Sequence, residues 1–224
     1  MDKREALFYF SIAWGSYVNR FDRVKGFEAK AVFENKDTDT QGAFGVANNR
    51  DFVIVFRGSE ETGIHDWITD LKFIKQVYPY QESNNKKVKV HYGFIQAYQS
   101  VREAVLDRVK KAPNQRIVCT GHSLGAALAC LCALDVQYNT HKSVRCFTYG
   151  CPKVGNSAFA DSYNKRVPKT YRFVTQGDLV PKLPPFGYHH VGELHELDHP
   201  DEDLSLMDKV AAHLPQTYIK SLRA

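Results

Sequence analysis

No stretch of this 224-residue sequence approaches the ~20 consecutive apolar residues that a transmembrane helix needs, so no transmembrane segment is expected. The marks of a secretion signal are also missing. Asp2 and Glu5 offset the two basic residues near the start, and no small-x-small cleavage site follows. Ala6, Phe10 and Trp14 instead recur at helical spacing, which predicts an amphipathic helix. These features predict a cytoplasmic protein, with secretion as the alternative.

Cysteine is sparse and shows no pairing pattern. The sequence has five cysteines, an odd number, and no two of them form a C-x-x-C pair. Most lie in apolar runs, so they are predicted to be reduced, buried and small hydrophobic side chains. This pattern favours a reducing compartment.

The sequence also lacks a strong excess of charge. Thirty basic and 25 acidic residues leave a net charge of +5. The longest basic cluster, residues 86–89, is short and has no interleaved aromatic residues, so no nucleic-acid partner is expected. A composition of 43% hydrophobic and 25% charged residues is typical of a globular protein. With no repeat, linker or low-complexity segment, residues 1–224 are predicted to form a single domain.

The hydrophobic pattern favours an α/β fold. Short runs rich in β-branched and aromatic residues are nearly continuous rather than alternating, as expected of central strands covered on both faces; they are residues 52–56, 116–120, 144–149 and 170–175. Helical patterns lie between them, one ending near residue 112 and one over residues 124–134. Strands separated by helices predict a mostly parallel central sheet flanked by helices.

Residues 121–125, Gly-His-Ser-Leu-Gly, fit the pattern G-x-S-x-G. A buried-type strand runs into the motif and an Ala/Leu helix leaves it, and this setting makes the short pattern specific. A serine at such a junction sits on a strained turn that exposes its hydroxyl above the sheet, and the glycines allow close backbone approach. Ser123 is therefore the predicted nucleophile.

A serine nucleophile needs a histidine base, and the base needs a carboxylate that orients it. In this kind of fold the acid and then the histidine follow the serine along the chain. Asp178 is the best acid, because it follows the strand-like run 170–175 through a Gln-Gly turn. Asp161 lies in a predicted helix, and the later aspartates lie in a polar stretch.

The histidine is the harder choice. The candidates after Asp178 are His189, His190, His195, His199 and His213. His213 follows the strand-like residues 191–197 beside a helical stretch, where a loop returns across the top of the sheet, so we predict it as the base.

Several ordered motifs resemble those of the class 3 lipase family, which includes filamentous-fungal triacylglycerol lipases. They are residues 56–59, 66–71, 90–94, 121–125, 149–156 and 178–185, closed by His213 with Tyr218. The resemblance runs from about residue 52 to residue 218. It implies an α/β-hydrolase fold with a triad of Ser123, Asp178 and His213, in agreement with the prediction from the residues.

The resemblance further implies an oxyanion hole formed by the backbone N–H groups of Ser59 and Leu124, with the Ser59 hydroxyl. It also implies a short helical lid. The apolar residues of that segment fall at i, i+3, i+4 and i+7 on one helical face; they are Ile64, Trp67, Ile68 and Leu71. The expected activity is hydrolysis of acylglycerols or related lipid esters, at a lipid–water interface if the lid moves. This chemistry calls for no cofactor and no metal.

Two other functions compete with ester hydrolysis. Residues 195–199 fit H-E-x-x-H, the zinc metalloprotease pattern, which requires a helix. Pro200 follows at once and the preceding residues look like a strand, which argues against that helix. A non-catalytic lipid-binding protein on the same fold is the second alternative. The complete set of Ser59, Ser123, Asp178 and His213 favours the hydrolase.

Overall fold

The computed structural model describes residues 2–18, 20–48, 50–58, 73–79, 87–112, 116–199 and 211–224. Within these ranges a seven-stranded sheet forms the centre of the molecule, in the spatial order β1-β2-β3-β6-β7-β8-β9. The strands are β1 (Phe27–Asn35), β2 (Thr40–Ala47), β3 (Asp51–Phe56), β6 (Arg116–His122), β7 (Val144–Tyr149), β8 (Thr170–Thr175) and β9 (Glu193–Leu197). β1, β2 and β3 pair antiparallel, and every pairing from β3 to β9 is parallel.

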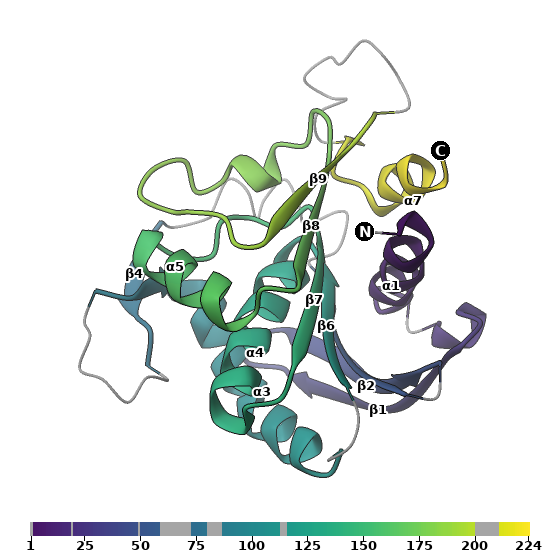
Figure 1. Ribbon diagram of the computed structural model, residues 1–224, viewed down its shortest axis with the longest axis horizontal. Helices are drawn as coiled ribbons and strands as arrows, with labels where there is room; N and C mark the ends of the chain where they lie inside the picture. The colour runs from purple at the N-terminus through teal and green to yellow at the C-terminus, as the bar shows by residue number, and fades with distance from the viewer. Residues whose placement is uncertain are drawn as a thin grey trace.

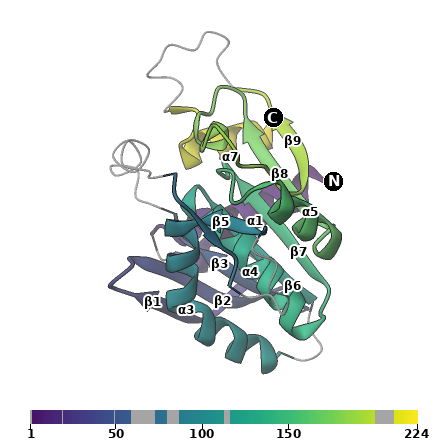
Figure 2. The ribbon, with the colours of Figure 1, turned by 90° about the vertical axis from the view of Figure 1, so that its left-hand side faces the viewer.

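Helices cover both faces of the sheet, as Figure 1 shows with the sheet nearly edge-on. α1 (Lys3–Gly15) and α7 (Pro215–Arg223) lie on one face, and α3 (Tyr92–Lys110), α4 (Leu124–Thr140) and α5 (Ser157–Arg166) lie on the other. Figure 2 shows α3 and α4 in front of the sheet. Short 3-10 turns, η1 (Phe21–Arg23) and η3 (Val180–Lys182), and a small antiparallel pair, β4 (Lys75–Val77) with β5 (Lys89–His91), complete the described elements.

The core is divided between the two faces of the sheet. One cluster joins α3, α4 and α5 to the sheet, and the other joins α1 and α7 to β6, β7 and β8. Central strands buried on both faces explain the continuous apolar runs in the sequence. The predicted parallel sheet is therefore confirmed, and the four predicted strands correspond to β3, β6, β7 and β8.

The N-terminal segment is a core helix. Asp2 caps α1 by accepting a hydrogen bond from the backbone N–H of Arg4, and Ala6 and Phe10 are fully buried. Glu5 forms a bidentate ion pair with Arg145 of β7, with N–O distances of 2.5 and 2.7 Å. The amphipathic helix expected from the spacing is confirmed.

The five cysteines are all buried and none forms a disulfide. Cys119 on β6 and Cys132 on α4 are in contact, with 3.6 Å between the two sulfurs. They behave as the small hydrophobic side chains that the sequence predicted.

Candidate active site

Ser123 lies between the last residue of β6 and the first residue of α4, in the middle of the sheet. Its φ of 59° and ψ of −128° fall in a region that costs non-glycine residues of order 1–3 kcal/mol. Its backbone N–H donates to the carbonyl oxygen of Tyr149 on β7 at 3.0 Å. The neighbouring strand thus helps to hold the strained turn in place.

The two glycines of the motif are required by close backbone contacts. A Cβ on Gly121 would overlap the carbonyl group of Gly125, and a Cβ on Gly125 would overlap the carbonyl oxygen of Phe56 on β3. Backbone atoms cannot move aside as a flexible side chain does. Both glycines of the G-x-S-x-G pattern are therefore needed because the start of α4 packs tightly against β3 and β6.

Three side chains from distant parts of the sequence form one hydrogen-bonded chain. His213 Nε2 lies 2.8 Å from Ser123 Oγ, and His213 Nδ1 lies 2.8 Å from Asp178 Oδ2. All three are at least 98% buried. A carboxylate only accepts hydrogen bonds, so the network assigns the imidazole proton to Nδ1 and leaves Nε2 to accept from the Ser123 hydroxyl. The three residues predicted from the sequence are brought together.

Asp178 is oriented by further donors. It lies on the loop between β8 and η3, where its Oδ1 accepts from the backbone N–H of Val180 at 2.9 Å. The Tyr218 hydroxyl on α7 donates to Asp178 Oδ2 at 2.6 Å. Burial, and then the Asp178 charge, raise the pKa of Tyr218 well above its usual value of 10, so the phenol remains a neutral donor. From the sequence, Tyr218 is predicted only as part of a family motif. Its hydrogen bond to Asp178 is visible only in the structure.

Gly150 makes room for the imidazole. It follows β7 with a φ of +58°, and a Cβ built there would lie 2.7 Å from His213 Cε1 and 3.0 Å from Asp178 Oδ2. The backbone passes close beside the histidine–aspartate pair, and only glycine fits both the conformation and the space. The sequence placed Gly150 in a motif without assigning it a role.

His122 supports both the backbone and the ring of His213. Its Nε2 lies 2.8 Å from the His213 carbonyl oxygen, and the two rings stack with centroids 4.6 Å apart. Burial, and then the proximity of His213, lower the pKa of His122 well below 6.5, so the ring is neutral. Nε2–H therefore donates to the carbonyl, and Nδ1 accepts from the Tyr17 hydroxyl at 2.8 Å. No local pattern predicts this support, because Tyr17 and His122 are far apart along the chain.

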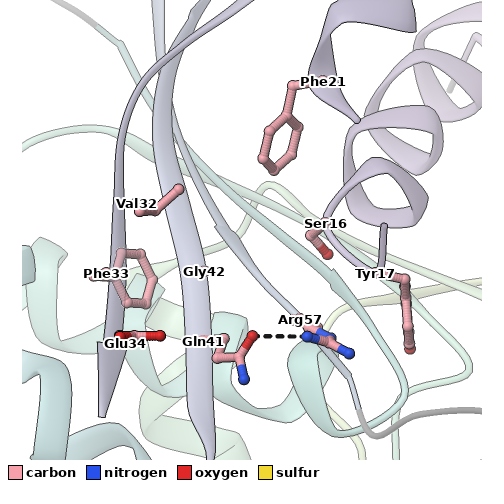
Figure 3. A pocket seen from close by; sticks show the side chains of 9 residues that line it. All are labelled: Ser16, Tyr17, Phe21, Val32, Phe33, Glu34, Gln41, Gly42 and Arg57. Carbon is pink, nitrogen blue, oxygen red and sulfur yellow. Dashed lines mark hydrogen bonds between the residues drawn. The ribbon is translucent and has the colours of Figure 1, made fainter. Parts of the chain in front are cut away.

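Tyr17 lies just beyond the end of α1, at the edge of a cleft of about 130 Å³ between that helix and the β1–β2 pair (Figure 3). Its neighbour there is Arg57, whose Nη1 donates to Gln41 Oε1 at 2.7 Å. The cleft is lined by Ser16, Tyr17, Phe21, Val32, Phe33, Glu34, Gln41, Gly42 and Arg57. Arg57 and Gly58 follow β3 and lead to Ser59, the predicted oxyanion residue. Because Tyr17 and Arg57 line the same cleft, the end of α1 lies beside the segment that leads to the predicted oxyanion hole.

The predicted oxyanion hole lies partly within the described residues. Leu124 is the first residue of α4, and N–H groups in the first turn of a helix have no acceptor within it. Ser59 and the four lid residues, Ile64, Trp67, Ile68 and Leu71, lie outside the described residues.

The H-E-x-x-H segment does not have the geometry of a zinc site. Residues 195–197 belong to β9, where alternate side chains point to opposite faces, so the helical i, i+4 arrangement is absent. The His195 ring stacks on Phe173 at 5.0 Å and its Nε2 lies 3.3 Å from Glu193. The strand therefore argues against the metalloprotease alternative.

The family model, the related sequences and the related structures all indicate the same family. A family model described as lipase (class 3) matches residues 53–188. The lipase of Rhizomucor miehei is 38% identical over 167 residues, which cover 70% of this chain and 44% of that protein. The secreted mono- and diacylglycerol lipase A of Penicillium cyclopium is 34% identical over 161 residues, covering 69% and 50%. A solved triacylglycerol lipase whose catalytic centre is formed by a serine protease triad has a TM-score of 0.77 at 30% identity, covering 97% of this chain and 91% of that one.

The chain spans about half the length of the curated relatives it matches. The solved relatives, together with the mostly parallel sheet, confirm the predicted α/β-hydrolase fold.

The comparisons overturn the expected cytoplasmic location, because several relatives are named as secreted. The expectation rests on the first residues and on the lack of a cysteine pairing pattern, and buried cysteines pack as hydrophobic side chains in any compartment. The first residues are the more direct part of that basis. These form the buried helix α1, whose sequence reflects packing in the core and carries no information about location. Within the described ranges, each helix is too short or too polar to cross a bilayer.

Proposed function

We propose, because this chain belongs to the class 3 lipase family, that it hydrolyses carboxylic esters of acylglycerols or related lipids. The observation that carries the proposal is the unbroken hydrogen-bond chain from Ser123 through His213 to Asp178. Residues 1–224 act as one domain in this proposal, because seven strands from β1 to β9 form one sheet and α1 and α7 pack together on one of its faces.

In the acylation step, the Ser123 oxygen attacks the ester carbonyl carbon while its proton passes to His213 Nε2. The negative charge that develops on the carbonyl oxygen is stabilised by the backbone N–H groups of Leu124 and Ser59, with the Ser59 hydroxyl. Removing one such donor typically costs ~2.7–4 kcal/mol of transition-state stabilisation. His213 then gives its proton to the alcohol oxygen as the carbon–oxygen bond breaks, which leaves an acyl-serine.

In the deacylation step, His213 removes a proton from water, and the resulting nucleophile attacks the acyl-serine carbonyl. The proton returns from His213 to Ser123 Oγ as the free carboxylic acid leaves. Asp178 keeps its charge throughout and stabilises the imidazolium that forms twice in the cycle. Its contacts with Tyr218 and Val180 hold it in the orientation that this role requires.

Substitution of the triad tests the proposal. Ser123→Ala and His213→Ala should each lower kcat by at least ~10⁴-fold while the melting temperature stays near that of the wild type. His199→Ala is the matched control and should remain nearly fully active. Hydrolysis of a chain-length series of p-nitrophenyl and glycerol esters measures the effect.

Covalent labelling separates a hydrolase from a non-catalytic lipid-binding protein. A long-chain organophosphonate should add one equivalent to the wild type and none to Ser123→Ala, as read by intact mass. Substantial ester turnover by Ser123→Ala, or an unlabelled wild type, would refute the assignment.

The proposal includes a lid formed by Ile64, Trp67, Ile68 and Leu71. It is supported by their helical spacing and by their position directly after Ser59 in the sequence. A lid that opens toward lipid makes the rate rise once a sparingly soluble ester exceeds its solubility limit. Trp67→Asp should weaken this rise more than it lowers the rate on the dissolved ester. A smooth hyperbola for the wild type, with no rise at the limit, would contradict the lid.

A further inference from the structure

A second depression, of about 290 Å³, lies where the end of α1, the segment around η1 and the helix α7 meet. It is lined by Ser11, Trp14, Gly15, Val18, Arg20, Arg23, Val24, Ile219 and Arg223. None of the catalytic side chains lines it. Its volume is near the lower end of the ~300–1,000 Å³ that small-molecule sites occupy.

One part of the lining is apolar. Trp14 is half-buried and Val18 is 62% exposed, while Val24 and Ile219 are each at least 91% buried. An exposed valine beside a tryptophan gives an apolar surface that water covers at a free-energy cost. A hydrocarbon chain placed on it would remove that surface from water.

The polar part of the lining is cationic. Arg20, Arg23 and Arg223 are exposed, and no aspartate or glutamate is among the described residues that line the depression with them. Within the described residues, none of these three guanidinium groups has an ion-pair partner.

Arginines elsewhere in the molecule are used differently. Arg102, Arg116 and Arg145 each form a bidentate ion pair with a carboxylate. The planar guanidinium fork matches a carboxylate or a phosphate in the same bidentate way. Three guanidinium groups that have no ion-pair partner in the described part of the chain therefore surround one depression and offer positive charge to an anionic group.

We infer that this depression binds a single-chain amphiphile with an anionic head group, either a carboxylate or a phosphate. The head group lies among the three arginines, and the hydrocarbon chain lies on Trp14, Val18 and Ile219. A long-chain fatty acid, the product of the proposed hydrolysis, belongs to this class; that identification rests on the proposed function, whereas the binding itself does not. The end of α1 and the residues after it connect the site to the catalytic centre, because Tyr17, which bonds to His122, lies between Trp14 and Val18 in sequence.

Tryptophan fluorescence tests the binding without catalysis. The chain has two tryptophans, so Trp67→Phe leaves Trp14 as the sole reporter, and Ser123→Ala in the same protein removes turnover. Titration with decanoate or decyl phosphate, below their micelle concentrations, should change the Trp14 emission with saturation at one equivalent. The tighter of the two ligands identifies the preferred head group. Because the reporter protein is catalytically inactive by design, a failure of the proposed hydrolase function leaves this result unaffected.

Matched variants locate the site. Arg20→Gln, Arg23→Gln and Arg223→Gln combined should weaken decanoate binding at least tenfold, whereas Arg4→Gln, an exposed arginine on α1 outside the depression, should not. Circular dichroism checks that the triple variant is folded. Equal affinity for decanol, equal affinity for inorganic phosphate, or binding only to anionic phospholipid vesicles would overturn the proposal. An unchanged Trp14 emission, or full affinity in a folded triple variant, would overturn it as well.

Discussion

Ser123 occupies the position at which a serine often caps a helix, yet its side chain makes no capping hydrogen bond to α4. The positive φ turns the hydroxyl away from the first N–H groups of that helix and toward His213, 2.8 Å away. The hydroxyl is therefore available for proton transfer, and the N–H of Leu124 is left for an oxyanion. The unusual backbone conformation thus favours both the proposed proton transfer and the proposed oxyanion binding.

Gly150 gives a residue-scale prediction. In Gly150→Ala the new methyl group, built 2.7 Å from His213 Cε1, should displace the imidazole from Ser123. Misplacement of a catalytic group by about 1 Å can cost ~10²-fold in rate, so we expect a fall of that size in kcat with a smaller change in KM. Steady-state kinetics on a soluble ester measures it.

Gly187→Ala is the control for backbone strain. Gly187 also has a positive φ, +68°, but it is exposed, and its added Cβ would meet only the flexible end of Lys75. Both variants should lose stability, and only Gly150→Ala should lose most of its activity. Equal kcat values for the two would show that the imidazole is not confined by Gly150.

At the scale of elements, α1 links the strands that carry the site. The Tyr9 hydroxyl donates to Asp51 of β3, and the Tyr149 hydroxyl of β7 donates to the Ala6 carbonyl oxygen. Tyr17 reaches His122 at the end of β6. The helix and Tyr17 just beyond its end thus contact three neighbouring strands. Through His122, Tyr17 is connected by hydrogen bonds to the backbone of His213.

Tyr17→Phe tests this link. The substitution keeps the ring and removes the hydroxyl, which leaves the buried Nδ1 of His122 without this donor. Such a loss typically costs ~1–3 kcal/mol of stability. We expect a lower melting temperature together with a several-fold fall in kcat at nearly constant KM, because His213 would be held less firmly.

The matched control is Tyr92→Phe on α3, where the tyrosine is 48% exposed. Its loss of a hydroxyl should leave kcat and melting temperature close to wild type. If Tyr17→Phe lowers stability without lowering kcat, the tyrosine is structural and does not position the histidine.

For the whole molecule, the buried His122 and the half-buried His190 couple stability to pH. The pKa of His122 is lowered well below 6.5, first by burial. The pKa of His190 is lowered to about 3 by burial and then by the charges of Arg172 and Lys153. Both folded-state values lie below the unfolded value, so the unfolded chain takes up protons that the native protein does not as the pH falls below about 6.5.

We therefore expect the free energy of unfolding to decrease as the pH falls through 6.5 toward 4.5. Each such histidine adds a slope of at most ~1.4 kcal/mol per pH unit. Urea unfolding at pH 7.5, 6.5, 5.5 and 4.5 measures the slope. His190→Gln should make it shallower by up to one histidine's share, and a slope unchanged or steeper in this variant would contradict the assignment.

Local sequence patterns were sufficient for the central strands and for Ser123. Strands β3, β6, β7 and β8 are largely buried on both faces, so their apolar runs stand out, and a G-x-S-x-G serine between such a strand and an Ala/Leu helix is typical of a nucleophile. Strands β1 and β2 were missed. β1 is largely exposed and β2 carries two glycines that leave room for phenylalanine rings, so neither shows a clear pattern.

By itself, the sequence was enough to predict the order and kind of the proposed catalytic groups: serine, then aspartate, then histidine, each next to a recognisable element. Only the tertiary structure decided what surrounds them. Gly150 beside the imidazole, Tyr218 on the carboxylate and Tyr17 behind His122 join segments far apart in the chain. A local pattern reflects the secondary-structure propensity and the burial of its own segment. These contacts depend instead on how the carboxyl ends of β6, β7 and β8 come together with α1 and α7 in space.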